Sequence, residues 1–304
     1  MVRGSPRTTS RNSHRDSTPF TGIAPSGRET GATVTTIVDR AGTHVSWRFR
    51  LLGTLVRRDL ESRYRGSLLG ILLPLAVQLA QLLVFTYLFA TIFKVRLAVP
   101  GVGNSGLAYG LWLFAGLAGW NAMQAGVMGA ATSITGRPNL VKRLVFPLAI
   151  VPLVPVCTAL IESLAGFAVV IVLALVAAHT FHPTVLLVPL VIVIQLVLTA
   201  GLAYVAAAGT TLVRDLPQAL GPLFMFAFYL TPIVYSPDRV PPAFRFAVTY
   251  NPLAVIFNAY RSLILNGTLP PLRPLAFSAI AAAFIAYAGW RFFRHVRPLF
   301  GDVL

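Results

Sequence analysis

The chain has 304 residues, of which 56% are hydrophobic and 11% charged, a mean hydropathy of +0.74 and a formal net charge of +16. Soluble domains carry about a quarter charged residues, so a globule of this composition would lack polar surface. Residues 97–136 and 182–213 contain no Lys, Arg, Asp or Glu, and such runs of more than about 18 residues are typical of membrane spans. The composition excludes a soluble globular protein and predicts an all-α polytopic membrane protein.

The Lys and Arg residues lie before and between the apolar runs rather than within them, as is typical of a membrane protein. Twelve of the 25 Lys and Arg residues precede Gly66, and the rest lie in short segments between apolar runs, a pattern that sets membrane topology. We therefore expect no nucleic-acid partner. The single Cys157 and five scattered histidines predict neither a disulfide framework nor a metal site.

Residues 1–45 are rich in Arg, Ser, Thr and Gly and lack the apolar core of a signal peptide. Their composition predicts a disordered cytoplasmic tail that the fold does not need. Residues 46–304 are expected to form the transmembrane domain.

An amphipathic helix is predicted over residues 49–65. Apolar residues recur there in steps of three and four, which keeps them on one helical face: Phe49, Leu52, Val56, Leu60 and Tyr64. Asp59 with Arg63, and Glu61 with Arg65, are spaced as stabilising ion pairs. A basic amphipathic helix of this kind lies in the membrane interface, and Gly66 then allows a bend into the first span. A plain topology anchor would explain the arginines but not the paired acids.

Six spans follow, near 68–93, 107–134, 145–178, 184–212, 218–235 and 275–291. With both termini cytoplasmic, nineteen basic residues lie inside and six outside, as the positive-inside rule favours. Residues 236–274 form an outer segment in which Asn251 and Pro252 can cap and begin a helix. Two short re-entrant helices fit this segment better than one broken span, which is the alternative.

Glu162 is the charged residue predicted to lie in the interior of a span. An acid in the bilayer costs several kcal/mol, so it indicates a functional or a pairing role. Glu162 could face a channel or bond across helices.

Several segments resemble the membrane subunits of ABC-2 polysaccharide exporters, which are the O-antigen (Wzm-like) and teichoic-acid (TarG-like) permeases. They cover residues 50–300 in order: "RRDLESRYRGSLLGILLPL", "YGLWLFAGLAGWNAM", "TGRPNLVKRLVFPLAIVPLVPV", "LVRDLPQAL", "YLTPIVYS" and "YNPLAVIFNAYRSLI". The N-terminal Arg/Ser-rich tail departs from the family pattern.

The resemblance implies an interface helix (49–65) and a coupling helix (about 135–143) that grip a separate ATPase. The sequence contains no G-x-x-x-x-G-K-[ST] phosphate loop, so we expect no cofactor here and ATP with Mg²⁺ on two partner ATPase subunits. The alternative is that these charges only set topology. The candidate ATPase-docking residues are Arg57, Arg58, Asp59, Glu61, Arg63, Arg65, Arg137, Asn139, Lys142, Arg143, Arg214 and Asp215.

Aromatic residues concentrate in the first, second and fifth predicted spans, which line the translocation path in the resembling family. Sugars present apolar C–H faces to rings, although interfacial aromatic belts would give a similar composition. The candidate path residues are Phe85, Tyr87, Phe89, Trp112, Trp120, Phe224, Phe228, Tyr229 and Glu162. The candidate outer gate consists of Asn251, Pro252, Tyr260 and Arg261.

The sequence therefore predicts a homodimeric permease, not an enzyme, in the bacterial cytoplasmic membrane. It would move lipid-linked polysaccharide outward among membrane lipids, powered by the ATPase. The alternatives are an ABC-2 exporter of drugs or small lipids and a membrane-embedded enzyme, which would need an interfacial cluster of acids or histidines.

Overall fold

The computed structural model describes residues 32–65, 72–95, 97–136, 147–179 and 182–300. Its contacts divide the chain after Ser46, and the unit described below begins at Trp47. Predictions for the tail before residue 32, the bend at Gly66 and the candidates at 137–143 lie outside the described residues.

Helix α1 (Ala32–Tyr64) contains the predicted amphipathic helix and begins before the expected boundary at residue 46. Val56 is buried and packs against Ile150 and Val154. Ile150 precedes helix α5 (Leu153–Ala178), and Val154 lies in its first turn. Phe49, at the other end of the predicted apolar face, is 70% exposed. The predicted apolar face is thus used for packing from Leu52 onward, and Phe49 at its start is the exception.

One of the two predicted ion pairs on α1 is confirmed. Arg63 Nε lies 3.0 Å from Asp59 Oδ2. Glu61 instead pairs with Arg57, at 2.7 Å between Nε and Oε1, so the predicted pairing with Arg65 was wrong. Both arginines are four residues from Glu61, and spacing alone does not choose between them.

The long helices follow in chain order, several of them with short 3₁₀ or π-helical extensions. They are α2 (Leu72–Thr86) with η1 (Tyr87–Ile92), α3 (Gly106–Ala131), η2 (Leu148–Ile150) with α5 (Leu153–Ala178), η3 (Pro183–Leu187) with α6 (Val188–Leu212), α7 (Leu216–Leu230), and α10 (Leu272–Val296) with η6 (Arg297–Leu299).

Four helical segments of the described chain are long and apolar enough to cross a membrane: Leu72–Ile92, Leu148–Ala178, Pro183–Leu212 and Leu272–Leu299. They agree with the predicted first, third, fourth and sixth spans. The predicted second span corresponds to α3, whose Gly, Trp and Asn content lowers its hydropathy. The predicted fifth span corresponds to α7, which has only 15 residues. A helical polytopic membrane protein is therefore confirmed, with four rather than six spans established.

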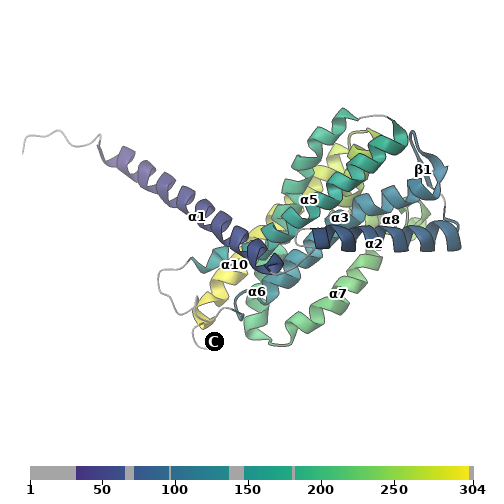
Figure 1. Ribbon diagram of the computed structural model, residues 1–304. Coiled ribbons are helices and arrows are strands. Elements are labelled where there is room, and N and C mark those ends of the chain that lie inside the picture. Colours follow the sequence, from purple (N-terminus) through teal and green to yellow (C-terminus); the bar gives the residue numbers. More distant parts are fainter. Residues whose placement is uncertain (1–31, 66–71, 96, 137–146, 180–181, 301–304) are drawn as a thin grey trace, which may run out of the picture. The chain divides into compact units, whose positions relative to one another are not determined.

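Helix α3 forms the centre of the bundle and contacts α2, α5, α6, α7 and α9 (Pro252–Arg261) (Figure 1). Most of its residues are buried, including Tyr109, Phe114 and Met123. Its many small residues let neighbouring helices approach closely, as is common in membrane bundles.

The prediction of a purely helical chain is wrong in one detail. Strands β1 (Leu97–Val99) and β2 (Gly103–Ser105) form an antiparallel hairpin between η1 and α3. Val102 N–H donates to Val99 O across a turn in which Gly101 has φ +78°. Pro100 followed by Gly101 is a typical turn dipeptide, so the signal was present in the sequence.

The segment between α7 and α10, predicted to lie on the outer side, contains η4 (Pro237–Arg239), α8 (Pro242–Thr249), α9 and η5 (Ser262–Asn266). Asn251 Oδ1 accepts a hydrogen bond of 2.9 Å from Leu253 N–H at the start of α9. The two short helices and the Asn cap are therefore confirmed.

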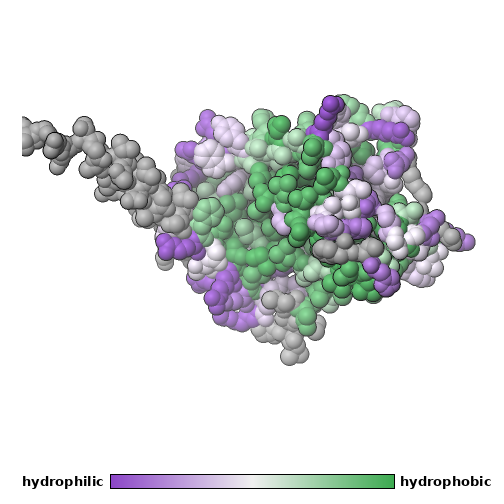
Figure 2. All heavy atoms as spheres, turned by 90° about the horizontal axis from the view of Figure 1, so that it is seen from above, coloured by the Kyte–Doolittle hydropathy of each residue, from purple (hydrophilic) through white to green (hydrophobic). Residues whose placement is uncertain are grey.

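Figure 2 shows a broad apolar region on the face it presents, with hydrophilic side chains gathered toward its margins. Exposed apolar residues occur on every long helix, but on α3 they lie only near its two ends, because its centre is buried. Such a surface is suited to lipid or to further protein.

Candidate functional site

An aromatic cluster lies on one side of α3, where α2 and α7 flank it. Trp120 meets Phe224, Phe228 and Phe257 edge to face, with ring centroids 5.9, 5.5 and 6.2 Å apart. The cluster borders a cavity of about 230 Å³. Its lining residues come from α2, α3 and α7: Gln81, Phe85, Leu117, Trp120, Asn121, Gln124, Gly221, Phe224, Met225, Phe228 and Tyr229.

A second, larger cavity of about 660 Å³ continues along α2 and α3 toward the C-terminal end of α1 and Glu162 on α5. It shares Gln81, Asn121 and Gln124 with the first cavity, so the two form one groove along α3. The remaining lining residues are Arg63, Tyr64, Leu73, Pro74, Val77, Gln78, Ala125, Met128 and Glu162. The groove is thus aromatic at one end and polar at the other.

The three shared carboxamides, called the amide cluster below, are bonded to their surroundings through only some of their atoms. Asn121 Nδ2 donates to Gln81 Oε1 at 2.8 Å. Gln124 Oε1 accepts from the indole Nε1–H of Trp120 at 3.0 Å. These bonds orient the amides and tie them to the aromatic wall of the groove.

Glu162 bonds across helices, which is one of the two roles that the sequence left open, and it also lines the groove. Its Oε1 accepts a hydrogen bond of 2.6 Å from the Tyr64 hydroxyl and lies 3.7 Å from Arg63 NH1. Burial and this hydrogen bond raise the pKa of the Tyr64 hydroxyl, which therefore remains a donor at physiological pH. The contact joins α5 to the C-terminal end of α1.

The candidate gate residue Arg261 is buried, with 2% of its surface exposed. Its guanidinium donates to the carbonyl oxygens of Trp112 (3.1 Å), Pro232 (2.9 Å) and Ile233 (2.7 Å), and to Asn258 Oδ1 (2.8 Å). Its Cζ lies 3.5 Å from the centroid of the Trp112 ring. Arg261 thereby satisfies the carbonyls of Pro232 and Ile233 in the segment after α7 and holds α9 against α3.

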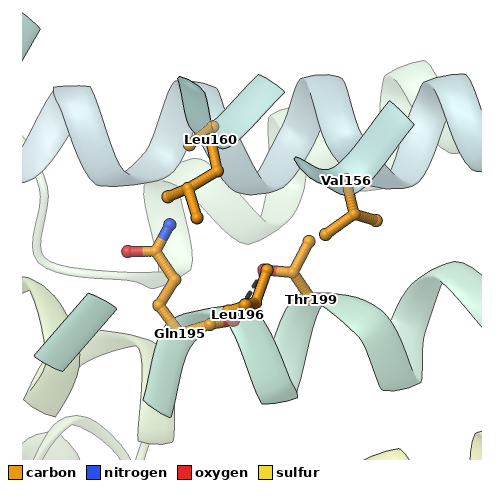
Figure 3. A pocket seen from close by; sticks show the side chains of 6 residues that line it. Val156, Leu160, Gln195, Leu196 and Thr199 are labelled. Carbon is orange, nitrogen blue, oxygen red and sulfur yellow. Dashed lines mark hydrogen bonds between the residues drawn. The ribbon is translucent and has the colours of Figure 1, made fainter. Parts of the chain in front are cut away.

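The candidate gate residue Tyr260 belongs to a second buried network. Its hydroxyl donates to Gln195 Oε1 at 2.7 Å, and Gln195 Nε2 donates to the Gly119 carbonyl at 2.8 Å. A cavity of about 10 Å³ beside Gln195 is lined by Leu160 and Thr199, among others (Figure 3). It has room for at most about one water molecule, so the groove rather than this interior gap can hold a substrate.

The structure brings five of the predicted path aromatics together in the groove and sets Glu162 at its polar end: Phe85, Trp120, Phe224, Phe228 and Tyr229. Phe89 instead packs on Phe93 and Tyr109, and Trp112 lies under Arg261. Tyr87 is 62% exposed on η1. These three line neither cavity.

The described docking candidates lie at the surface of α1 and of the connection before α7. Arg57, Arg58, Glu61, Arg65, Arg214 and Asp215 are exposed, and Asp59 and Arg63 form the ion pair described above.

The sequence analysis missed the amide cluster and Tyr64 as groove residues. Gln78 and Gln81, like Asn121 and Gln124, are three residues apart in otherwise apolar helices, which places each pair on one face. That spacing was a usable signal.

The groove offers side chains that can hold a ligand, namely aromatic rings, carboxamides and one acid–base contact. Within the described residues no group of three or more His, Cys, Asp or Glu side chains could hold a metal ion.

The chain matches a known protein family over most of its length. Residues 50–265 match the model of the family described as ABC-2 type transporter, which covers α1 from Arg50 through α9 and most of η5. The chain belongs to the ABC-2 type transporter family. It is therefore a transport subunit with membrane-spanning helices, as the resemblance implied.

Known relatives match over most of the chain. An O-antigen export system permease protein RfbA from Klebsiella pneumoniae is 29% identical over 227 residues, which are 74% of this chain and 84% of the relative. A second protein of that name from the same organism is 25% identical over 86% of this chain and 97% of the relative. The Myxococcus xanthus protein of that name is 28% identical over 83% and 94%.

Proposed function

We propose that this ABC-2 chain is the permease subunit of an exporter that moves lipid-linked polysaccharide across the bacterial cytoplasmic membrane. The groove along α3 carries the proposal, because its aromatic wall and its amides match the two kinds of surface that a sugar presents. The names of the relatives, which are O-antigen export permeases, support the same substrate class.

Two copies of the chain would form a homodimer around one path, with both termini cytoplasmic and α3 and α7 as the additional spans. Two copies of a separate ATPase subunit would bind ATP and Mg²⁺. The exposed arginines of α1 and the segment around Arg214 would dock the ATPase. Its closure would reach the bundle through Val56 and through the Tyr64–Glu162 contact.

The outer helices would act as a gate on the far side. Since Tyr260 and Arg261 are buried in fixed networks, α9 would move with α3 as one body, and these residues would hold the gate rather than touch the substrate.

Co-expression with a candidate ABC ATPase subunit from the same organism tests the proposal. We expect the ATPase to co-purify with the permease, and the Arg57→Glu/Arg58→Glu variant to retain less than a third of it. The Arg273→Glu variant, which changes an exposed arginine on α10, is the matched control. An ATPase that does not bind, or that binds the α1 variant as well as the control, contradicts the proposal. Export of a drug or small lipid in place of glycan by the assembled complex would favour the alternative substrate class.

A further inference from the structure

The groove contains carboxamides where a membrane bundle would normally place apolar side chains. Gln81 on α2 and Asn121 and Gln124 on α3 are partly buried and line both cavities. A polar group removed from water costs free energy unless it is hydrogen-bonded, so this concentration of amides requires an explanation.

Hydrogen-bond accounting shows that the amides keep capacity for a ligand. A carboxamide offers two N–H donors and an oxygen with two lone pairs. In the described part of the chain, the amide nitrogen of Gln81 and the amide oxygen of Asn121 take part in no hydrogen bond, and the nitrogen of Gln124 has only a 4.0 Å contact with Met128 Sδ. Both donors and acceptors are therefore free to bond along the groove wall.

The charge of the groove restricts the ligand. Among the described residues that line the two cavities, Arg63 is the one cation, and it is held by Asp59 at 3.0 Å and approached by Glu162 at 3.7 Å. Recognition of phosphate or carboxylate relies on free Arg or Lys donors. Of the Arg63 nitrogens, only Nε has a hydrogen bond to a described residue, but the charge of Arg63 is opposed by Asp59 and Glu162. A polyanion would therefore meet described lining residues with no net positive charge.

We infer that the amide cluster selects uncharged, hydroxyl-rich glycan segments and disfavours polyanionic polymers such as poly(glycerol phosphate). Hydroxyls exchange donor and acceptor bonds with amides, while the sugar C–H faces lie on Trp120 and its neighbouring rings. Hydrogen bonds between neutral groups are weaker than charge-assisted ones. Each sugar unit would therefore be held weakly enough to leave the groove. The inference deepens the proposed function, on which it rests, by naming the substrate class of the groove.

Intrinsic tryptophan fluorescence of the full chain in lipid nanodiscs tests the inference. The probes are a neutral mannose octasaccharide and an octamer of glycerol phosphate. We expect the neutral probe to give a saturable change that is lost in Trp120→Phe, and the anionic probe to give at least tenfold weaker binding.

The Gln81→Met/Asn121→Leu variant removes two amides that bond each other, so neither partner is left unsatisfied. We expect it to weaken binding of the neutral probe at least fivefold, while Asn104→Leu, which removes an exposed amide on the hairpin, leaves it unchanged. Met128→Lys adds a cation to the larger cavity and should strengthen binding of the anionic probe. This variant tests the inference if the double variant does not fold.

Equal or tighter binding of the anionic probe by the unaltered protein would overturn the inference. So would an unchanged affinity in the double variant, or a lack of binding of both probes. Neither probe requires the ATPase, so these failures are distinct from failure of the export proposal, which co-purification decides.

Discussion

At the scale of single residues, the buried Arg261 is accommodated inside an apolar bundle because it bonds to several partners. Arg261 donates four hydrogen bonds and stacks on Trp112. Gly116 is required beside it, because a Cβ there would lie 2.6 Å from Arg261 NH2. The cation therefore serves as a cross-link between α3, α9 and the end of α7.

Replacing Arg261 tests that cross-link. Arg261→Met keeps the length of the side chain but leaves buried carbonyls without a donor, at a cost of about 1–3 kcal/mol for each. We expect thermal unfolding of the purified protein at a clearly lower temperature, with Arg261→Lys intermediate because lysine lacks the planar fork. The exposed Arg273→Met is the control. An Arg261→Met protein as stable as this control would show that the network is not structural.

Glu162 gives the second prediction at this scale. Glu162→Gln can still accept a bond from Tyr64 but loses its attraction to Arg63. We therefore expect slower export with normal binding of the ATPase subunit. A double-mutant cycle of Tyr64→Phe with Glu162→Ala, which removes the acceptor, should give a coupling of about 1–2 kcal/mol in unfolding experiments. Unchanged export in Glu162→Gln would remove this residue from the path.

At the scale of elements, close helix contacts hold the bundle together. The backbones of α6 and α10 meet at Gly201 and Gly289, where a Cβ on Gly289 would collide with the Gly201 carbonyl. A Cβ on Gly201 would lie 2.6 Å from Ala286 N. In a membrane such close packing replaces much of the hydrophobic driving force between helices.

Gly289→Ala should force α6 and α10 apart. We expect a loss of about 1–3 kcal/mol of stability, the usual cost of overpacking a core, measured as a lower thermal unfolding temperature. Gly53→Ala on α1 is the control, since a Cβ there meets nothing within 4 Å, and alanine favours a helix over glycine by about 1 kcal/mol. If both variants are equally stable, the helices do not need their close approach.

At the scale of the whole molecule, the orientation that we propose for the chain in the membrane decides which end of the groove faces the cytoplasm. Its polar end, at Arg63 and Glu162, would face the cytoplasmic side together with α1, and the β1–β2 hairpin would lie outside. Substrate would then meet the acid–base contact first and the rings later.

Cysteine labelling measures this orientation. In a Cys157→Ser background, which removes the single native cysteine, we expect Asn104→Cys on the hairpin to react with a membrane-impermeant maleimide added to intact spheroplasts. Glu61→Cys on α1 should react only after permeabilisation. The reverse pattern would invert the proposed topology and place the docking surface on the wrong side.

Local patterns were sufficient for much of the fold. Runs of apolar residues located the four long spans, three-and-four spacing located the amphipathic part of α1, and Asn251 with Pro252 located the start of α9. These features depend on residues within a few turns of one another, which periodicity and capping rules describe directly.

The site depended on contacts between distant residues. Gln81 bonds Asn121 across 40 positions, Tyr64 bonds Glu162 across 98, and Arg261 bonds Trp112 across 149. Nothing in the sequence distinguished Phe89 and Trp112 from the other predicted aromatics. Only the packing showed that these two lie outside the groove.

The sequence by itself determined that the chain is a helical membrane protein and that it resembles polysaccharide permeases. The tertiary structure alone decided which polar groups share one groove and which, like Arg261, are fixed inside the bundle. The physical reason is that hydropathy and spacing act along one helix, whereas a groove exists only where several helices leave space between them. Burial and hydrogen-bond partners follow from that packing and are not encoded in any single segment.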